Sequence, residues 1–377
     1  MKLAIISHTE HYINADGRLV GWSPTVNEIN HLLSVFDTIY HVAMLHKGEA
    51  PDSTMAYTSA QIHFVPLPVL GGTTLGSKLK TIVQAPKVIR LVSQTLSQVD
   101  YFQLRTPTGI GVYLIPYLTF FSRRKGWYKY AGNWNQKRPP LGYAIQRWFL
   151  KQQSRPVTIN GQWPRQPRHC YSFENPCLTE SDIDMGTQVL QDKTFDKVSF
   201  CYVGRLEQQK GVERIIKAFS NIDSSLLSRI GQVHLVGEGS EMSRFKSLSS
   251  DNGVSFVFHG ALSRDEVFQV YAQSHVFLMP TTASEGFPKV IAEALAFGCI
   301  PVVSDLSSIS QYVIHRENGF LINPYDINEF ITTLNTLLQF KLEDYHDLLK
   351  HRLDIIHKFT FEYYNQHIIK SILNSIN

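Results

Sequence analysis

One stretch of the sequence, residues 281–305, limits the possible folds of this chain more than any other. Its letters are TTASEGFPKVIAEALAFGCIPVVSD. They indicate the end of a strand, a loop ending at Gly286, a helix opened by Pro288 and then a buried strand. Proline is favoured in the first turn of a helix, where its missing N–H would have no partner, and Gly298 supplies the helix stop. The stretch therefore predicts a strand–helix–strand unit of a parallel sheet.

Two carboxylates in this stretch, Glu285 and Glu293, are separated by seven residues. Glu285 lies in the predicted loop and Glu293 inside the helix, so a ligand can meet both without their sharing a helix face. The free amides of Gly286, Phe287 and Lys289 point out of the helix N-terminus and favour an anion. For this spacing alone, a buried turn with two solvated glutamates is the alternative. The Gly-Phe-Pro-Lys sequence between the acids favours the ligand site.

The pattern of the whole chain predicts two domains, which suits a length of 377 residues. Strand and helix patterns alternate through residues 1–175 and restart through residues 198–359. This alternation predicts an α/β fold with two parallel-sheet domains. Residues 176–197 are polar and are predicted to be the linker. A final helix, residues 360–377, is expected to pack back across the domain junction.

Cysteines and apolar runs indicate a cytoplasmic protein without a metal. Cys170, Cys177, Cys201 and Cys299 have no metal-ligand spacing and are interpreted as reduced core thiols. The Asp182-Ile-Asp184 sequence in the predicted linker is interpreted as a solvated turn. No signal-peptide pattern follows Met1, and the longest apolar run, residues 109–121, is too short to span a bilayer.

Charge divides the chain into two different halves. Up to Asn175 there are 19 Lys and Arg against 8 Asp and Glu, and the remainder has 17 against 24. Residues 101–173 contain no acid, twelve basic residues and interleaved aromatics such as Trp127 and Trp148. An anionic membrane surface is one candidate partner, and a solvated basic face over an ordinary core is the alternative. Nucleic acid is excluded as the expected partner because no binding-module pattern accompanies the charge.

Three predicted strand exits in the second half carry groups suited to a diphosphate and a sugar. Parallel sheets bind ligands at the carboxyl ends of their strands. The first exit brings Arg205 and Lys210, and Arg binds phosphate oxygens as a fork while Lys acts as a point charge. The second brings a Gly237-Glu238-Gly239 turn. Glu285 and Glu293 could accept hydrogen bonds from hydroxyls. Together, the cations and the carboxylates predict a site for a nucleotide sugar.

Several segments resemble a known family: GRLEQQKG (204–211), VGEG (236–239), SEGFPKVIAEALAFGCIPVVSD (284–305) and ENGFLINPYD (317–326). They are similar to the retaining glycosyltransferases of the glycogen-synthase-like group, or family 4, also called glycosyl transferases group 1. The resemblance is strong over the second half only. It implies a GT-B fold with two Rossmann-like domains facing a cleft. It also implies transfer of a sugar from a UDP- or GDP-sugar with retention of configuration, without a required cofactor or metal.

The resemblance also implies roles for individual residues. Arg205 and Lys210 stabilise the departing diphosphate, Glu285 holds the donor sugar and Glu293 holds the ribose. The remaining donor-side positions are Gly204, Gly237, Glu238, Gly286, Phe287, Pro288 and Lys289. The expected acceptor is a glycan or a polyprenyl-diphosphate-linked glycan of bacterial polysaccharide synthesis, which would suit peripheral attachment to the inner face of the cytoplasmic membrane.

The first half departs from the family pattern. Many relatives carry a histidine after the strand that here reads WYKYAGNW, where this sequence has Gly132 and Asn133. Asn133 is an acceptor-side candidate. Gly17 and Gly21 lie where relatives have a glycine-rich loop, and they are interpreted as turn formers or as acceptor-loop residues.

Three other functions are compatible with this pattern. A nucleotide-sugar epimerase or a glycan phosphorylase could use the same fold, although no pyridoxal lysine is identifiable. A non-catalytic nucleotide-sugar-binding subunit is favoured by the missing histidine. An NAD-dependent oxidoreductase is disfavoured because the first strand is not followed by a G-x-G-x-x-G turn.

Overall fold

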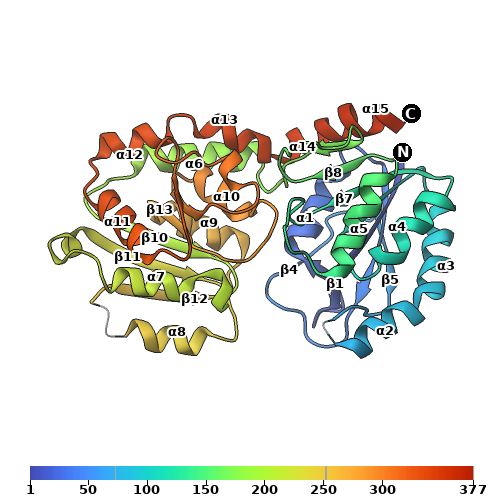
Figure 1. The fold of residues 1–377 in the computed structure, drawn as a ribbon, viewed down its shortest axis with the longest axis horizontal. Coiled ribbons are helices and arrows are strands. Elements are labelled where there is room, and N and C mark those ends of the chain that lie inside the picture. The colour runs from blue at the N-terminus through green and yellow to red at the C-terminus, as the bar shows by residue number, and fades with distance from the viewer. Residues whose placement is uncertain (73, 251–252, 377) are drawn as a thin grey trace. The chain divides into compact units, whose positions relative to one another are not determined.

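The computed structural model describes residues 1–72, 74–250 and 253–376. The chain forms two compact units (Figure 1). Unit 1 comprises Met1–Asn175 and Phe361–Asn377, and unit 2 comprises Pro176–Thr360. Among the residues described, no helix is long and apolar enough to cross a membrane.

Unit 1 is a largely parallel sheet covered by helices. Its elements are β1 (Lys2–Ile13), β2 (Leu19–Trp22), α1 (Ser23–Leu32), β3 (Thr38–Leu45), β4 (Thr54–Ala56), β5 (Ile62–Leu67), α2 (Leu75–Val83), α3 (Ala85–Leu96), β6 (Tyr101–Thr106), α4 (Gly111–Phe120), β7 (Lys125–Tyr130), α5 (Leu141–Gln152), β8 (Val157–Ile159) and β9 (Cys170–Ser172). The parallel strands run in the order β5-β3-β1-β6-β7-β8-β9. The order along the chain reverses between β1 and β6.

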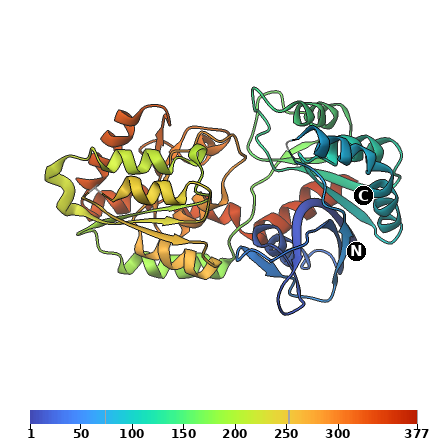
Figure 2. The ribbon, with the colours of Figure 1, turned by 90° about the horizontal axis from the view of Figure 1, so that it is seen from below.

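Unit 2 contains a six-stranded parallel sheet. Its elements are α6 (Glu180–Asp192), β10 (Val198–Val203), α7 (Val212–Phe219), β11 (Ile230–Val236), α8 (Met242–Ser249), β12 (Ser255–Gly260), α9 (Arg264–Gln273), β13 (Val276–Met279), α10 (Lys289–Ala296), β14 (Ile300–Ser304), β15 (Phe320–Ile322), α11 (Ile327–Leu338), α12 (Leu342–Leu349) and α13 (Arg352–Ile356). The strand order is β12-β11-β10-β13-β14-β15, with every neighbour parallel. Here the order reverses between β10 and β13. Figure 2 shows helices on both faces of this sheet.

Burial follows from this architecture. Strands β13 and β14 are buried along their whole length, because helices cover both faces of the sheet. They therefore read as continuous apolar runs rather than as alternating ones. The predicted strand–helix–strand unit of residues 281–305 is the α10 segment with β14, and Gly298 ends the helix at a positive φ of 76°.

The predicted linker, residues 176–197, is wrong for most of its length. Helix α6 occupies Glu180–Asp192 and belongs to unit 2. Thr179 caps it, because its side chain accepts from the Asp182 amide while the Asp182 carboxylate accepts from the Thr179 amide. Asp182 is also not a solvated turn residue, since it is buried and pairs with Arg264 at 3.1 and 2.6 Å. The acids that gave this segment the polar character of a linker include Glu180 and Asp182. Both lie in the first turn of the helix, and Asp182 takes part in its cap.

The C-terminal segment returns to unit 1. Helix α14 (Phe361–His367) continues into a π-helical turn (Ile368–Leu373) and α15 (Asn374–Ile376). The Asn365 amide donates to the His31 carbonyl and to the Ser34 hydroxyl, both at 2.8 Å. The His367 ring stacks on Phe173 with centroids 3.9 Å apart. The segment thereby completes a core cluster of unit 1 that includes Ile372.

Candidate functional site

The candidate site lies at the carboxyl edge of the unit 2 sheet, where the strand order reverses. The chain leaves β10 at Gly204 and β13 at Pro280, and these two strands are neighbours. Their outgoing loops lead to α7 and α10 and contact each other, since the Thr282 amide donates to the Gln209 carbonyl at 2.8 Å. Open α/β sheets bind ligands at such a reversal. The structure therefore brings the first and third predicted strand exits together, and the exit of β11 lies beside that of β10.

Three glycines allow the loops at this edge to touch through their backbones. A Cβ at Gly237, where φ is +125°, would lie 2.0 Å from the Gly204 carbonyl oxygen. A Cβ at Gly239 would lie 2.2 Å from the Leu206 oxygen, and one at Gly211 would lie 2.2 Å from the Pro280 oxygen. No other residue fits such approaches. The Leu206 amide also donates to the Glu238 carbonyl at 2.8 Å, so Glu238 contributes to the site through its backbone.

The charged residues form two ion pairs. Lys210 Nζ contacts Glu285 Oε1 and so joins the loop after β10 to the loop after β13. The Lys210 side chain is 13% exposed and that of Glu285 is 40% exposed, which leaves the carboxylate accessible. Arg205 is 68% exposed and pairs at 2.9 Å with Glu207 on its own loop. The structure thus brings Lys210 to Glu285, while Arg205 lies on the same edge with its guanidinium held by Glu207.

The loop before α10 is fixed by an aromatic anchor. Phe287 is 4% exposed and packs against Phe359 and Tyr312, with ring centroids 4.6 and 4.9 Å away. The anchor holds Gly286 and Pro288 against the start of α10, whose first residue is Lys289. The first amides of a helix have no partner within the helix and carry partial positive charge. An anion at this end is therefore favoured beside the Lys210 ammonium.

Glu293 lies in α10 and faces a different set of partners from Glu285. The Tyr271 hydroxyl donates to its carboxylate at 3.4 Å. Burial raises the pKa of Glu293, and the positive charges of Arg264 and Lys289 oppose that rise. A half-buried carboxylate of this kind has acceptor capacity for hydroxyl donors.

The acceptor-side glycines, Gly17 and Gly21, lie in a β-hairpin formed by β1 and β2. Gly17, with φ of 72°, closes the turn between β1 and β2, and its amide donates to the Asn14 carbonyl at 3.0 Å. Gly21 is on β2, where a Cβ would lie 2.5 Å from the His11 ring. Asn133 follows the carboxyl end of β7, and its side-chain oxygen accepts from the Asn135 amide at 3.0 Å.

His8 is a residue that the sequence patterns missed. It lies on β1 just beyond the part of that strand that pairs with β6, in the bulge of the β1–β3 pairing between Ile6 and Glu10. Its Nε2 accepts from the Ile110 amide at 3.3 Å. A Cβ at Gly109 would lie 3.2 Å from the His8 ring, and one at Gly71 would lie 3.5 Å from it. Burial lowers the pKa of His8 to about 4, so the ring is neutral at pH 7 and Nδ1 carries the proton. Sequence patterns did not predict this position of His8, because its partner Ile110 lies 102 residues away along the chain.

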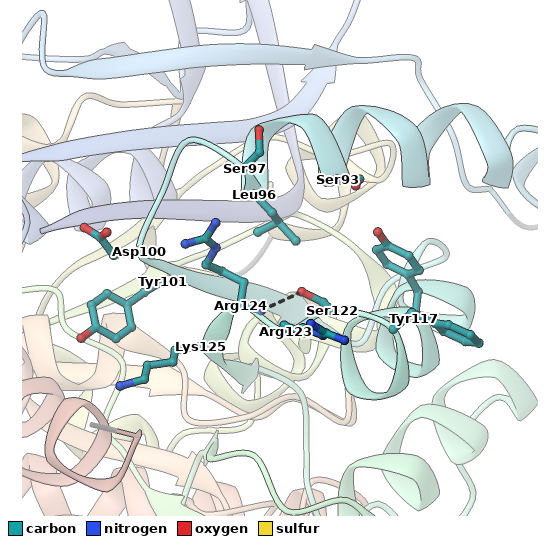
Figure 3. Close-up of a pocket in the computed structure, with 11 residues that line it drawn as sticks. Ser93, Leu96, Ser97, Asp100, Tyr101, Tyr117, Ser122, Arg123, Arg124 and Lys125 are labelled. Atoms are coloured by element: carbon teal, nitrogen blue, oxygen red, sulfur yellow. Dashed lines mark hydrogen bonds between the residues drawn. The ribbon is translucent and has the colours of Figure 1, made fainter.

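A basic hollow of unit 1 lies at the opposite, amino edge of its sheet (Figure 3). Its volume is about 670 Å³, and it is bounded by the end of α3, the end of α4 and residues 122–125. Figure 3 shows Arg124 directed toward the end of α3. The carboxyl-edge rule gives no reason for a substrate there.

Over the described parts of the chain, no group of three or more His, Cys, Asp or Glu could hold a metal ion. All four cysteines are free and buried. Burial raises the pKa of the Cys170 thiol to about 12 and that of Cys177 well above its usual range.

The chain is similar to known proteins in sequence and in fold. Residues 191–351 match the family described as Glycosyl transferases group 1. Sucrose-phosphate synthase from Thermosynechococcus elongatus superposes with a TM-score of 0.74 at 17% identity, covering 100% of this chain and 99% of that one. HepE of Anabaena, in complex with UDP and glucose, superposes with a TM-score of 0.70 at 17% identity, covering both chains fully. The fold is GT-B, as predicted, and the match to the glycosyl transferases group 1 family lies within unit 2.

Curated relatives match over part of their length. Lipopolysaccharide 1,6-galactosyltransferase of Salmonella typhimurium is 27% identical over 185 residues, which cover 47% of this chain and 50% of that protein. Sulfoquinovosyl transferase SQD2 of Arabidopsis thaliana is 30% identical over 147 residues, which cover 38% of this chain and 27% of that protein. The match thus spans at most half of these relatives.

Proposed function

We propose that the protein is a hexosyltransferase that moves a sugar from a nucleoside-diphosphate sugar to a glycan or lipid-linked acceptor with retention of configuration. The observation that carries the proposal is the contact of Lys210 with Glu285 at the β10/β13 reversal, beside the N-terminus of α10. This arrangement joins a cation, a carboxylate and the N-terminal amides of a helix at one sheet edge. A diphosphate and the hydroxyls of its sugar need these three kinds of group.

The donor would exchange one set of contacts for another. Its diphosphate would compete with Glu285 for the Lys210 ammonium, and the freed carboxylate would accept hydrogen bonds from the sugar. Arg205 would leave Glu207 for the phosphates, and Glu293 would accept from the ribose. The backbone of this donor site would be shaped by Gly204, Gly237, Gly286 and Pro288.

Chemistry then depends on stabilising the leaving group. The bond from the sugar anomeric carbon to the diphosphate oxygen breaks, and its electron pair remains on the diphosphate. The acceptor oxygen attacks on the same face of the sugar, and its proton passes to the leaving phosphate. Lys210, Arg205 and the α10 amides stabilise the new negative charge, so the proposed reaction requires neither metal nor cofactor.

The relatives suggest which substrates to test first. HepE is described in complex with UDP-glucose, so UDP-sugars come before GDP-sugars. The similarity to a lipopolysaccharide galactosyltransferase supports a glycan acceptor of bacterial surface polysaccharide. A lipid-linked acceptor would place the protein on the cytoplasmic side of a membrane, with its basic unit toward anionic headgroups.

The acceptor side of the proposal rests on His8. This neutral ring lies at the carboxyl edge of unit 1, beside the loops that contain Gly71 and Gly109. It is positioned to hydrogen-bond an acceptor hydroxyl in place of the histidine that the Gly132–Asn133 position lacks. Asn133, Gly17 and Gly21 remain further acceptor-side candidates.

The experiment measures transfer from a panel of UDP- and GDP-sugars to a lipid-diphosphate acceptor. Lys210→Ala and Glu285→Ala should abolish transfer. Lys350→Ala and Asp347→Ala, which remove an exposed ion pair of 2.8 Å elsewhere in unit 2, should leave it intact. Full activity in both site variants would refute the site. Donor binding without transfer would favour a non-catalytic subunit, and dependence on free phosphate would favour a phosphorylase.

His8→Ala separates the two sides of the reaction. The variant should keep the affinity for UDP, because His8 belongs to unit 1, and should raise the KM for the acceptor. An unchanged acceptor KM would remove His8 from the proposal and leave the donor site standing.

A further inference from the structure

Helix α2 of unit 1 exposes an apolar stripe. Leu75, Leu79, Ile82 and Val83 are 84%, 66%, 53% and 67% exposed. Their spacing of i, i+4, i+7 and i+8 places all four on one helix face. Isolated exposed leucines are ordinary on soluble proteins, but four aligned aliphatic side chains form a surface that is costly to leave in water.

The stripe faces away from the body of unit 1. The opposite side of α2 is fixed by Thr81, which is 4% exposed. Its hydroxyl donates to the Ser77 carbonyl at 2.9 Å and accepts from the Gly71 amide at 3.1 Å. Thr74 caps the helix by accepting from the Ser77 amide. Because the polar face of α2 is held against unit 1, its apolar face points toward solvent.

Positive charge flanks the stripe on both sides. Lys78 and Lys80 are exposed and lie on either side of the stripe around the helix axis. Lys87 and Arg90 follow on α3 and are also exposed. Residues 53–99 contain no Asp or Glu at all. An apolar helix face bordered by basic residues matches a surface that is apolar inside and anionic outside, which is the headgroup boundary of an anionic bilayer.

The position of α2 connects this surface to the candidate acceptor edge. Figure 1 shows the N-terminus at the top of unit 1 and α2 at its lower end, the carboxyl end of β1. A Cβ at Gly109 would lie 3.6 Å from Thr81 and 3.2 Å from His8, so the buried side of α2 borders the loops around His8. A bilayer against the stripe would lie next to the edge proposed for the acceptor.

We propose that α2 is an interfacial membrane helix, which inserts Leu75, Leu79, Ile82 and Val83 among anionic phospholipid headgroups while Lys78 and Lys80 contact the phosphates. The inference rests on the membrane contact of unit 1 that we proposed above, and it assigns that contact to helix α2. Each basic residue near an anionic surface raises binding about fivefold, and each aliphatic side chain that enters raises it about tenfold.

A rival surface lies at the amino edge of the same unit. Phe120 and Phe121 are 68% and 77% exposed and precede Arg123, Arg124 and Lys125 at the hollow of Figure 3. This patch also combines exposed apolar side chains with basic residues, but it lies at the opposite edge from the loops around His8. It therefore supplies a matched control for the α2 variants.

The test is flotation of the full chain with vesicles of phosphatidylcholine, with and without phosphatidylglycerol. The wild-type protein should bind only the anionic vesicles, and more weakly as salt increases. The double substitution Leu79→Gln and Ile82→Gln should lower the affinity about 100-fold, and Lys78→Gln with Lys80→Gln about 25-fold. Phe120→Gln with Phe121→Gln should leave it unchanged. All of these side chains are exposed, so unchanged thermal unfolding is expected for each variant.

A second readout locates the helix directly. All four native cysteines are buried, so a Leu79→Cys variant can be labelled selectively with an environment-sensitive dye. Its emission should shift to shorter wavelength on addition of anionic vesicles and not on addition of neutral ones.

Three results would overturn the inference. They are absence of vesicle binding, binding that survives the α2 substitutions, and α2 substitutions that change only the oligomeric state in solution. The last would make the stripe a protein contact. None of these results bears on sugar transfer, because flotation needs no donor and transfer can be measured with a detergent-solubilised acceptor.

Discussion

Lys210 and Glu285 neutralise each other across two loops, and this pairing makes opposite predictions for their single substitutions. A bound diphosphate must take Lys210 from Glu285. Lys210→Gln should therefore weaken UDP binding and lower kcat/KM by about 100- to 1000-fold, the usual loss for one group that stabilises a transition-state charge. Glu285→Gln should lower transfer comparably but keep or raise the affinity for UDP, because it releases Lys210. Calorimetric titration with UDP and transfer kinetics measure the two effects. Weaker UDP binding in both variants would contradict the exchange.

Glu293 links binding to stability through its raised pKa. The folded state holds the Glu293 proton more tightly than the unfolded state does, so the carboxyl favours folding at low pH. That contribution is lost as the pH rises from about 4.5 through the folded-state value. Glu293→Gln should therefore raise the melting temperature at pH 7, with little gain near pH 4, and should weaken UDP binding. A melting temperature that falls at pH 7 would show that the ionised carboxylate stabilises the fold.

At the scale of elements, contiguous motifs were predictable and long-range contacts were not. The α10 segment carries its helix, the stop at Gly298 and the following strand β14 within residues 281–305, so its structure followed from local signals. The α6 helix was mistaken for a linker because its cap acids resemble a polar connection. Its partner Arg264 lies 82 residues away. His8 was missed for the same reason, since its contact with Ile110 spans 102 residues.

Helices α6 and α10 meet closely at Gly186, which predicts a destabilising substitution. A Cβ at Gly186 would lie 2.3 Å from the backbone oxygen of Ala296, at the end of α10. Gly186→Ala must therefore shift one helix against the other, at a cost of about 1–3 kcal/mol. Because α10 carries Glu293, UDP binding should weaken as well. Urea unfolding followed by circular dichroism measures the loss.

Gly76→Ala in α2 is the matched control for that substitution. Nothing lies within 4 Å of its Cβ position, so the change should be neutral or should stabilise by less than about 1 kcal/mol. Equal effects of the two substitutions would show that helix propensity, and not the contact between α6 and α10, governs Gly186.

At the scale of the molecule, the two units were predicted from different features of the sequence. Unit 2 repeats a family pattern in its loops, so its fold was predictable from residues 204–326, and the same segments supplied the candidate site residues. Unit 1 was predictable in its strand–helix rhythm and its charge. The antiparallel pairing of β1 with β2 was not, because only three residue pairs, from His11–Gly21 to Ile13–Leu19, form it. The exposed apolar stripe of α2 also needed the structure, since the packing of Thr81 shows which face of the helix is outward.

The return of the chain to unit 1 makes the C-terminal segment part of that unit's stability. Ile372 is fully buried in a cluster with Trp127 and Tyr364, whereas Ile369 on the same segment is 43% exposed. Ile372→Ala should therefore destabilise unit 1 by about 2–5 kcal/mol, and Ile369→Ala should have almost no effect. All five tryptophans lie in residues 1–175, so tryptophan fluorescence reports the unfolding of unit 1 alone. The affinity for UDP, which we assign to unit 2, should be retained by Ile372→Ala under conditions where unit 1 has unfolded. If UDP affinity were lost together with the tryptophan signal, the donor site would depend on an intact unit 1 and could not be assigned to unit 2 alone.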